Sequence, residues 1–276
     1  HIKVSGLVKN ENKLKNISNK ILIDLPCNKI RYKTNNKVVK VKKNKKYRLF
    51  KIFFNITEIF QYIKPKSFIY MNDKLLKFQI EKITRDYIEI QSLNDGYIYH
   101  NRGIVFDDIS NNLELFTSKD HTLINYINSA KSINYAGVSF VRNQKDIALS
   151  KKIIKKKIIL KLETPQAMKN IKYFSKHNDF ILLDRGDLIS FFGINKIEHV
   201  LNNIIKKLEK NKLIIATQLY YSYLGYNQPS ISDLILLNEY CKKNNIKGFQ
   251  LSEETALSKD PSSVLSSFNQ TLFSIK

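Results

Sequence analysis

Short apolar runs of strand length alternate with helix-like segments through the second half of the chain, and this alternation restricts the fold to few architectures. The clearest helical pattern lies at 196–208, with its apolar residues on one face. Continuous apolar strands separated by helices are typical of a parallel sheet covered by helices. Five such units favour a β/α barrel over a small open sheet. The runs are "YAGVSFVR" (135–142), "KIILKLE" (157–163), "DFILLDRGD" (179–187), "KLIIATQ" (212–218) and "IKGFQLSEE" (246–254), with "NKILIDLPC" (19–27) as an earlier one of the same kind.

The predicted strands end in polar residues. Ser139 lies at the end of the first run, Lys161 and Glu163 end the next, and Asp187 and Thr217 end the two that follow. In a β/α barrel the carboxyl ends of the strands open on one face, where catalytic groups lie, so we expect these side chains to converge. Taken alone, the "DRGD" cluster also fits a polar loop with a satisfied ion pair, and each other ending fits an ordinary ion pair.

Residues 33–112 follow a different pattern. Apolar and polar residues alternate with period two in "KVVKVKK", "KFQIEKI" and "DYIEIQS", and "MNDK" and "NDGY" are turn signals. We therefore predict a small all-β barrel domain at 33–112, inserted after an early strand of an α/β barrel. The barrel itself would be formed by residues 1–32 and 113–276.

The charge of the chain is strongly positive. Its 47 Lys and Arg residues exceed its 24 Asp and Glu residues, which gives a net charge of +23. Eleven of the cations lie in residues 29–51, which contain no acid. A footprint for nucleic acid or another polyanion, and steering of small anionic substrates, are both consistent with this run. Lys, Asn and Ile are over-used throughout the chain, however, so we favour compositional bias and do not favour nucleic acid as a partner.

The cellular compartment is constrained by what the sequence lacks. No run approaches the ~20 apolar residues of a membrane helix, and residues 1–20 have no apolar segment of a secretory signal. Two cysteines, Cys27 and Cys241, do not make a disulfide framework. We expect a cytoplasmic protein with no membrane partner.

An ordered set of motifs resembles the pyruvate kinase family. The set covers nearly the whole chain and is strongest over 113–276. Steps of 26, 30 and 37 residues separate Lys161, Asp187, Thr217 and Glu254, close to the family pattern. No single motif is specific, but their order is. The motifs are "ILIDLPCNKIR" (21–31), "DGYIYHNRGI" (95–104), "SFVR" (139–142), "KLETP" (161–165), "LLDRGDLIS" (182–190), "IIATQLYYSYL" (214–224), "YNQPSISDL" (226–234) and "LSEETALSKDP" (251–261).

The resemblance implies a (β/α)8 TIM barrel of the pyruvate kinase type with an inserted lid domain. "HIKVSG" (1–6) stands where the family has its second barrel strand. The first strand has no counterpart, and neither does the family's C-terminal domain, so we expect a barrel that is incomplete at the N-terminus. An open barrel edge would need a partner, and another polypeptide that completes the barrel is therefore a prediction.

The resemblance also implies a function and its residues. Pyruvate kinases transfer the phosphoryl group of phosphoenolpyruvate to ADP, giving pyruvate and ATP, with Mg²⁺ or Mn²⁺ and K⁺. Lys161 and Thr217 match the catalytic residues, and Glu163 and Asp187 match the metal ligands. The other implied roles are substrate binding by Gly186, Asp187, Thr217 and Ser139, nucleotide binding by Arg31 and Asp73, monovalent cation binding by Asp24 and Ser5, and an internal counter-ion to Asp187 in Arg185.

Several positions depart from the family pattern and keep alternatives open. The departures are His1, Lys3, Asp184, Ile189, Ile231 and Glu253. They suggest a catalytically degenerate protein kept for binding, regulation or work with a partner subunit. A metal-dependent lyase acting on 2-oxo acids would share the Glu163/Asp187 pair, but such an enzyme has no need of a phosphoryl-stabilising lysine at position 161.

Overall fold

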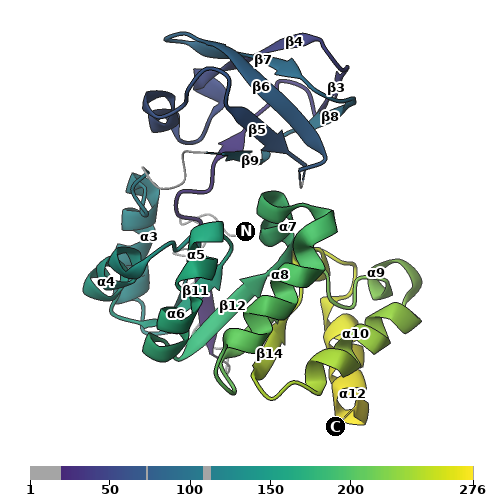
Figure 1. Ribbon diagram of the computed structural model, residues 1–276. Helices are drawn as coiled ribbons and strands as arrows, with labels where there is room; N and C mark the ends of the chain where they lie inside the picture. Colours follow the sequence, from purple (N-terminus) through teal and green to yellow (C-terminus); the bar gives the residue numbers. More distant parts are fainter. Residues whose placement is uncertain (1–19, 73, 108–112, 276) are drawn as a thin grey trace.

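A computed structural model describes residues 20–72, 74–107 and 113–275 of the chain. Six parallel strands form one curled sheet, in the order β1, β10, β11, β12, β13 and β14, and helices cover its outer side (Figure 1). The sheet has the half-barrel curl of a β/α barrel. The strands are β1 (Ile21–Leu25), β10 (Ile133–Val138), β11 (Lys157–Leu162), β12 (Phe180–Asp184), β13 (Leu213–Ala216) and β14 (Ile246–Gln250).

Apolar residues bury both faces of this sheet, which is why the strands read as continuous apolar runs. Leu160 and Leu183 belong to the large core between strands and helices. Ile159 and Leu182 are the neighbours of these residues along β11 and β12. Together with Ala216 of β13 they form a smaller buried cluster. The helices are α3 (Ser118–Ser129), α4 (Gln144–Ile153), α5 (Pro165–Lys169), α6 (Ile171–His177), α7 (Arg185–Phe192), α8 (Ile194–Lys207), α9 (Tyr223–Tyr226), α10 (Ile231–Cys241), α11 (Glu253–Ala256) and α12 (Pro261–Ile275).

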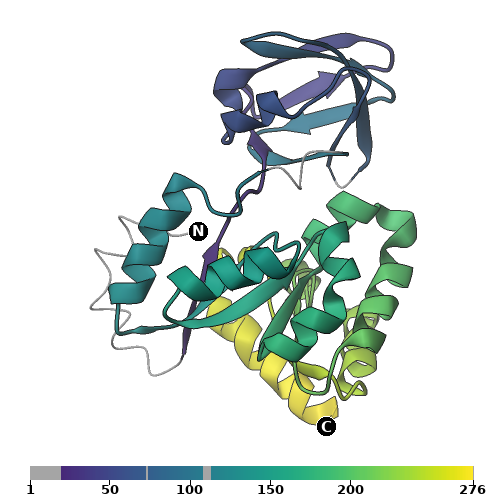
Figure 2. The same cartoon turned by 60° about the vertical axis from the view of Figure 1, so that its left-hand side comes forward.

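Antiparallel strands make up the second part of the molecule, which has a hydrophobic core of its own. It lies beyond the carboxyl ends of the parallel strands, and β9 contacts α7 (Figures 1 and 2). Its elements are β2 (Arg31–Tyr32), β3 (Val38–Val41), β4 (Lys46–Phe50), η1 (Lys51–Phe53), η2 (Thr57–Gln61), β5 (Phe68–Met71), β6 (Leu76–Ile83), β7 (Tyr87–Ser92), β8 (Gly96–Tyr99) and β9 (Arg102–Phe106). One sheet has the order β2-β9-β5-β6-β7-β4, and β3 pairs with β8 in another.

The sequence-based elements compare closely with these. The predicted helix at 196–208 is α8, and all six predicted parallel strands are present. All six strands end earlier than predicted: by one residue for β11, by two for β1 and β13, by three for β12 and by four for β10 and β14. A helix follows directly on β12. The division at 32/33 and 112/113 stays a prediction, although Arg31 and Tyr32 already pair with β9. "HIKVSG" lies outside the described residues, so the incomplete barrel also stays a prediction.

Candidate active site

Four of the sequence-predicted residues meet where three neighbouring strands end. β11, β12 and β13 are adjacent, with Lys161 opposite Leu182 and Asp184 opposite Ala216. Lys161 and Glu163 therefore lie beside the turn that carries Asp184 and Asp187. Thr217 follows β13 on the other side of that turn.

Lys161 is a buried cation surrounded by carboxylates. Only 7% of it is exposed, and its Nζ lies 3.0 Å from Glu163 Oε1, 3.3 Å from Asp24 Oδ2 and 3.6 Å from Asp184 Oδ2. Burial by itself lowers the pKa of Lys161, but the surrounding carboxylates, Glu163 foremost, outweigh it and raise that pKa well above its usual value. The ammonium group is therefore a fixed positive charge at neutral pH.

Glu163 is fully buried beside this cation. Its Oε2 accepts a hydrogen bond of 2.8 Å from the backbone N–H of Phe140, a residue held at φ 55° just beyond β10. Burial raises the pKa of Glu163, and although Lys161 opposes the shift, Asp187 and Asp184 add to it, so the pKa reaches about 8. Without a bound cation the Glu163 carboxyl is mostly protonated at neutral pH.

Asp187 is held by a cation that sequence reasoning missed. Lys29, in the segment between β1 and β2, forms an ion pair with Asp187 Oδ1 and lies 5.7 Å from the centre of the Phe140 ring. Burial favours the neutral acid, but Lys29, then Lys161, and also Arg31 keep the pKa of Asp187 below its usual value. Lys29 is the first lysine of the acid-free run, and its pairing spans 158 residues, so no local signal marked it.

Arg185 is not the counter-ion of Asp187, and the prediction that it would be is wrong. Its guanidinium is buried and donates to the backbone carbonyl of Thr217, at 3.1 Å from Nε. It also lies 5.8 Å from the centre of the Tyr240 ring. The Arg185 side chain, at the start of α7, thus contacts the residue that follows β13 and not Asp187.

Asp184 is the second residue that the sequence analysis undervalued. It is the N-cap of α7, and its Oδ1 accepts from the backbone N–H of Asp187 at 3.3 Å. Asp184, Glu163 and Asp187 each place a carboxylate oxygen within 4.8 Å of the other two. The spacing D-x-x-D ahead of a helix is an N-cap signal that could have identified this role.

Thr217 joins the turn of α7 to the end of β13. Its Oγ1 accepts from the backbone N–H of Gly186 at 3.2 Å and lies 3.1 Å from Asp184 Oδ1. Thr217, Gln218 and Tyr220 all have positive φ values, of 64°, 52° and 57°. For a β-branched residue this conformation costs about 1–3 kcal/mol, and such strain clusters at functional sites.

Asp24 connects β1 to the same group of charges. Its Oδ2 contacts Lys161, while its Oδ1 accepts no hydrogen bond from any described residue. A Cβ on Gly137, the register partner of Asp24, would lie 2.1 Å from Asp24 Oδ1, so a side chain there would displace the Asp24 carboxylate. Ser5 and Asp73, predicted for the monovalent cation and the nucleotide, lie outside the described residues.

Arg31 and Ser139 frame the group from two sides. Arg31 begins β2, and its guanidinium donates to Asn101 O at 2.9 Å. Its charge contributes to the lowered pKa of Asp187. Ser139 is buried immediately after β10, with its N–H donating to Leu25 O at 3.3 Å. Their predicted roles in binding nucleotide and substrate stay predictions.

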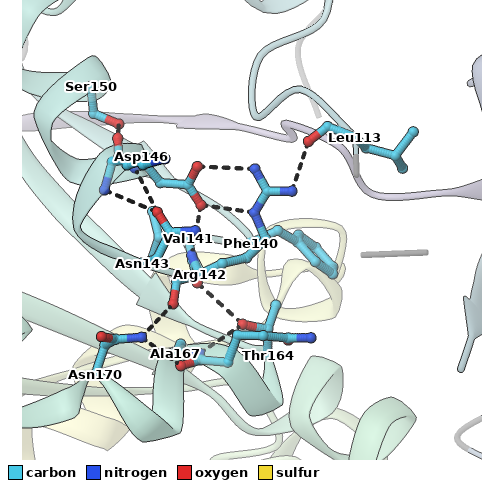
Figure 3. A network of polar contacts seen from close by, with 12 residues as sticks. Leu113, Phe140, Val141, Arg142, Asn143, Asp146, Ser150, Thr164, Ala167 and Asn170 are labelled. Carbon is cyan, nitrogen blue, oxygen red and sulfur yellow. Dashed lines mark hydrogen bonds and ion pairs between the residues drawn. The ribbon is translucent and has the colours of Figure 1, made fainter. Parts of the chain in front are cut away.

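Arg142, the arginine of "SFVR", pairs with Asp146 and does not join the group around Lys161. Arg142 forms a two-pronged ion pair with Asp146, at 2.8 and 2.9 Å, and donates to Leu113 O at 2.7 Å (Figure 3). The Arg142 carbonyl accepts from Asn170 at 3.0 Å. This network fixes the segment after β10, and with it the Phe140 N–H that holds Glu163.

The donor set suits a divalent cation. Three carboxylates converge, and hard oxygen ligands of this kind are those that Mg²⁺ and Mn²⁺ prefer. Glu163 Oε1 is buried and accepts no hydrogen bond of good geometry from the described part of the chain, although the Lys161 ammonium lies beside it. Burial raises the pKa of Glu163, and the neighbouring Asp187 and Asp184 carboxylates add negative charge that a cation would balance.

Comparisons with known proteins agree with this architecture. The family model described as "Pyruvate kinase, barrel domain" matches residues 9–235. The pyruvate kinase of Thermococcus litoralis is 26% identical over 200 residues, which are 70% of this chain and 42% of that protein. The pyruvate kinase of Clostridium perfringens is 26% identical over 181 residues, covering 63% and 38%. A crystal structure of Cryptosporidium parvum pyruvate kinase superposes with a TM-score of 0.80 at 19% identity, covering 98% of this chain and 61% of that one.

The parallel β/α half-barrel, with a lysine and three carboxylates at its strand ends, defines the chain as a β/α-barrel protein. Since the family model covers most of the chain, the chain belongs to the pyruvate kinase family. It spans less than half the length of the two curated relatives. Within the described residues, no helix is long and apolar enough to cross a membrane.

Proposed function

We propose that this chain carries a phosphotransferase site that moves a phosphoryl group between phosphoenolpyruvate and ADP. The observation that carries the proposal is the buried Lys161 ammonium, 3.0 Å from Glu163 and beside the Asp184–Asp187 turn. Phosphoryl transfer depends on positioning and charge neutralisation more than on covalent chemistry. A fixed, desolvated cation between carboxylates is suited to neutralising a phosphoryl group in flight.

Glu163 and Asp187, with Asp184 beside them, would hold Mg²⁺ or Mn²⁺. When bound, such a cation supplies charge neutralisation on the substrate's oxygens. Lys29 contacts only Oδ1 of Asp187, so Oδ2 could bind the cation, and a bound anionic substrate would compete for the Lys29 ammonium. Thr217 would orient a proton near the α7 turn, where its Oγ1 contacts the Gly186 N–H and Asp184 Oδ1. Asp24 contacts the opposite side of Lys161 and would contribute to a K⁺ site.

The antiparallel part, predicted at 33–112, would act as a lid over this site. Its position beyond the carboxyl ends of the parallel strands supports that role (Figure 1). Arg31 stands where the two parts join and would approach nucleotide phosphates. A cytoplasmic location, and a second polypeptide that completes the barrel, belong to the same proposal. Gel filtration of the pure chain as a stable, well-folded monomer would count against the second polypeptide.

The test of turnover is a coupled assay on the purified chain. It would receive phosphoenolpyruvate, ADP, Mg²⁺ and K⁺, with pyruvate measured through lactate dehydrogenase. We expect Lys161→Met to lower the rate by about a hundredfold or more, because one preorganised charge at the transition state contributes that much. Lys172→Met, which removes an exposed lysine from α6, is the matched control and should leave the rate unchanged.

A second function is favoured by one specific observation. The backbone N–H groups of Gly186 and Asp187, implied by the family resemblance to meet the substrate carboxylate, already donate to Thr217 Oγ1 and Asp184 Oδ1. This arrangement supports a degenerate site that is kept for binding or for work with a partner subunit. Calorimetry with oxalate and Mg²⁺ separates the two, since binding without turnover supports the degenerate site and turnover excludes it.

A further inference from the structure

The two-stranded sheet of β3 and β8 presents an exposed face with an unusual composition. In its register Val38 is opposite Tyr99 and Lys40 is opposite Tyr97, and all four side chains are exposed. We call these four residues the β3–β8 face. The alternate residues, Val39, Val41 and Ile98, pack against the core of the antiparallel part.

Two tyrosine rings lie next to each other on this face. Tyr97 and Tyr99 are 45% and 43% exposed, with ring centroids 6.4 Å apart and planes inclined by 40°. The Asn72 side chain donates to the Tyr97 carbonyl and so helps to hold β8 in place. Each ring therefore offers area to a flat partner without disturbing the core.

Lysines surround the rings. Lys37, Lys42 and Lys43 are exposed at or beside the ends of β3, within the acid-free run 29–51. A hollow of about 510 Å³ is lined by Lys40, Val41, Lys42, Asp95, Gly96 and Tyr97. Asp95 is the acid of this lining, and it accepts the Lys43 backbone N–H at 2.8 Å. Neither Lys40 nor Lys42 forms an ion pair with a described acid.

We infer that the β3–β8 face binds single-stranded nucleic acid. Exposed aromatic rings flanked by cations are how proteins hold single strands, because bases stack on the rings and phosphates contact the lysines. A duplex hides the base faces, so it would gain only the electrostatic part. The sequence alone favoured compositional bias as the explanation of the basic run, and the paired rings on the same face are what the structure adds. No residue of the candidate active site takes part, so this inference does not depend on the proposed function.

The test is fluorescence anisotropy with a labelled twelve-residue oligouridylate, repeated with oligothymidylate, across a range of KCl concentrations. Stacking contributes about 1–3 kcal/mol per base, so Tyr97→Ala/Tyr99→Ala should weaken binding roughly tenfold or more. Tyr221→Ala/Tyr226→Ala removes two tyrosines that are exposed elsewhere and should change affinity less than twofold. Lys40→Ala/Lys42→Ala should flatten the dependence of log K on log salt by about 1.4, at roughly 0.7 per lost phosphate contact.

Lys206→Ala/Lys207→Ala makes the same change in net charge on α8 and controls for the general positive charge of the chain. Equal losses in the two lysine pairs would overturn the inference, and so would unchanged affinity in the tyrosine double variant. Binding to phosphatidylserine vesicles that requires the β3–β8 face, with no affinity for either oligonucleotide at 150 mM KCl, would assign the face to a membrane surface and overturn it as well. Tighter binding of oligouridylate would identify the ligand as RNA, and tighter binding of oligothymidylate would identify it as DNA.

Discussion

Two buried charge clusters lie close together in this molecule, and they are balanced in opposite ways. Arg142 and Asp146 make a one-to-one pair, Arg142 also donates to Leu113 O, and the Asp146 carbonyl accepts from the Ser150 hydroxyl. Lys161 instead faces Glu163, Asp24 and Asp184, with Asp187 nearby. The first cluster is saturated and the second has an excess of negative charge.

The difference separates structure from chemistry. A saturated buried pair stabilises one arrangement and has nothing to offer a ligand. A proton or a cation can balance the negative charge of an excess of carboxylates. The raised pKa of Glu163 shows that this carboxyl binds a proton readily. Perturbed groups of this kind mark functional sites, whereas Arg142 and Asp146 position the segment that supports the site.

Removing the positively charged side chain from each cluster should lower the free energy of unfolding by different amounts. Arg142→Met leaves the buried Asp146 carboxylate without its partner and should lower the free energy of unfolding by about 3–5 kcal/mol. Lys161→Met should cost less, because Glu163 can hold a proton once the ammonium is gone. Urea denaturation at pH 7 measures both. An equal or larger loss for Lys161→Met would show that the second cluster is structural too.

The pH dependence of stability should sharpen the contrast. The pKa of Glu163 is about 8 in the folded chain and near 4.5 when exposed, so the folded state binds more protons between those values. The stabilising effect of that proton is fully present below about pH 4.5 and is lost as the pH rises through 8. The slope from this one group reaches at most about 1.4 kcal/mol per pH unit.

Urea denaturation at several pH values between 5 and 9 tests this dependence. Glu163→Gln should remove that part of the slope, while Glu198→Gln, at an exposed position on α8, should keep it. Parallel profiles for the wild type and Glu163→Gln would mean that Glu163 is already ionised in the folded chain. Mg²⁺ should flatten the wild-type profile if it replaces the proton.

The parallel sheet was predictable because its strands are buried on both faces and therefore read as continuous apolar runs. The strand ends were harder. β12 was predicted to run to Asp187, but Asp184 caps α7 and turns the chain into a helix three residues earlier. The apolar run ends at Leu183, and the N-cap preference of Asp184 then begins the helix; the same turn explains why Arg185 contacts Thr217 rather than Asp187.

The site was only partly predictable for a related reason. Lys161, Glu163, Asp187 and Thr217 could be found because each follows an apolar strand, and topology brings the strand ends together. Lys29 could not be found, because its contact with Asp187 depends on the path of the segment between the two parts of the molecule. The resemblance marked Asp184 as a departure from the family. Sequence alone did not show that its carboxylate accepts the hydrogen bond of the Asp187 backbone N–H.

The smallest expected effect concerns that donor. Asp184→Ala frees the backbone N–H of Asp187 and removes one carboxylate from the excess. It should raise the affinity for oxalate in the presence of Mg²⁺ by about two- to tenfold, the range expected for one additional hydrogen bond. Loss of the N-cap should cost about 1 kcal/mol of stability, partly offset by relief of repulsion. Calorimetry and urea denaturation measure the two effects.

Ser230→Ala separates capping from binding in this experiment. Ser230 caps α10 through the N–H of Asp233, in a capping box, so its loss should cost a similar amount of stability and leave oxalate affinity unchanged. Lower oxalate affinity in Asp184→Ala would mean that Asp184 acts as a third ligand of the cation. Unchanged affinity would mean that the Asp187 N–H takes no part in binding oxalate.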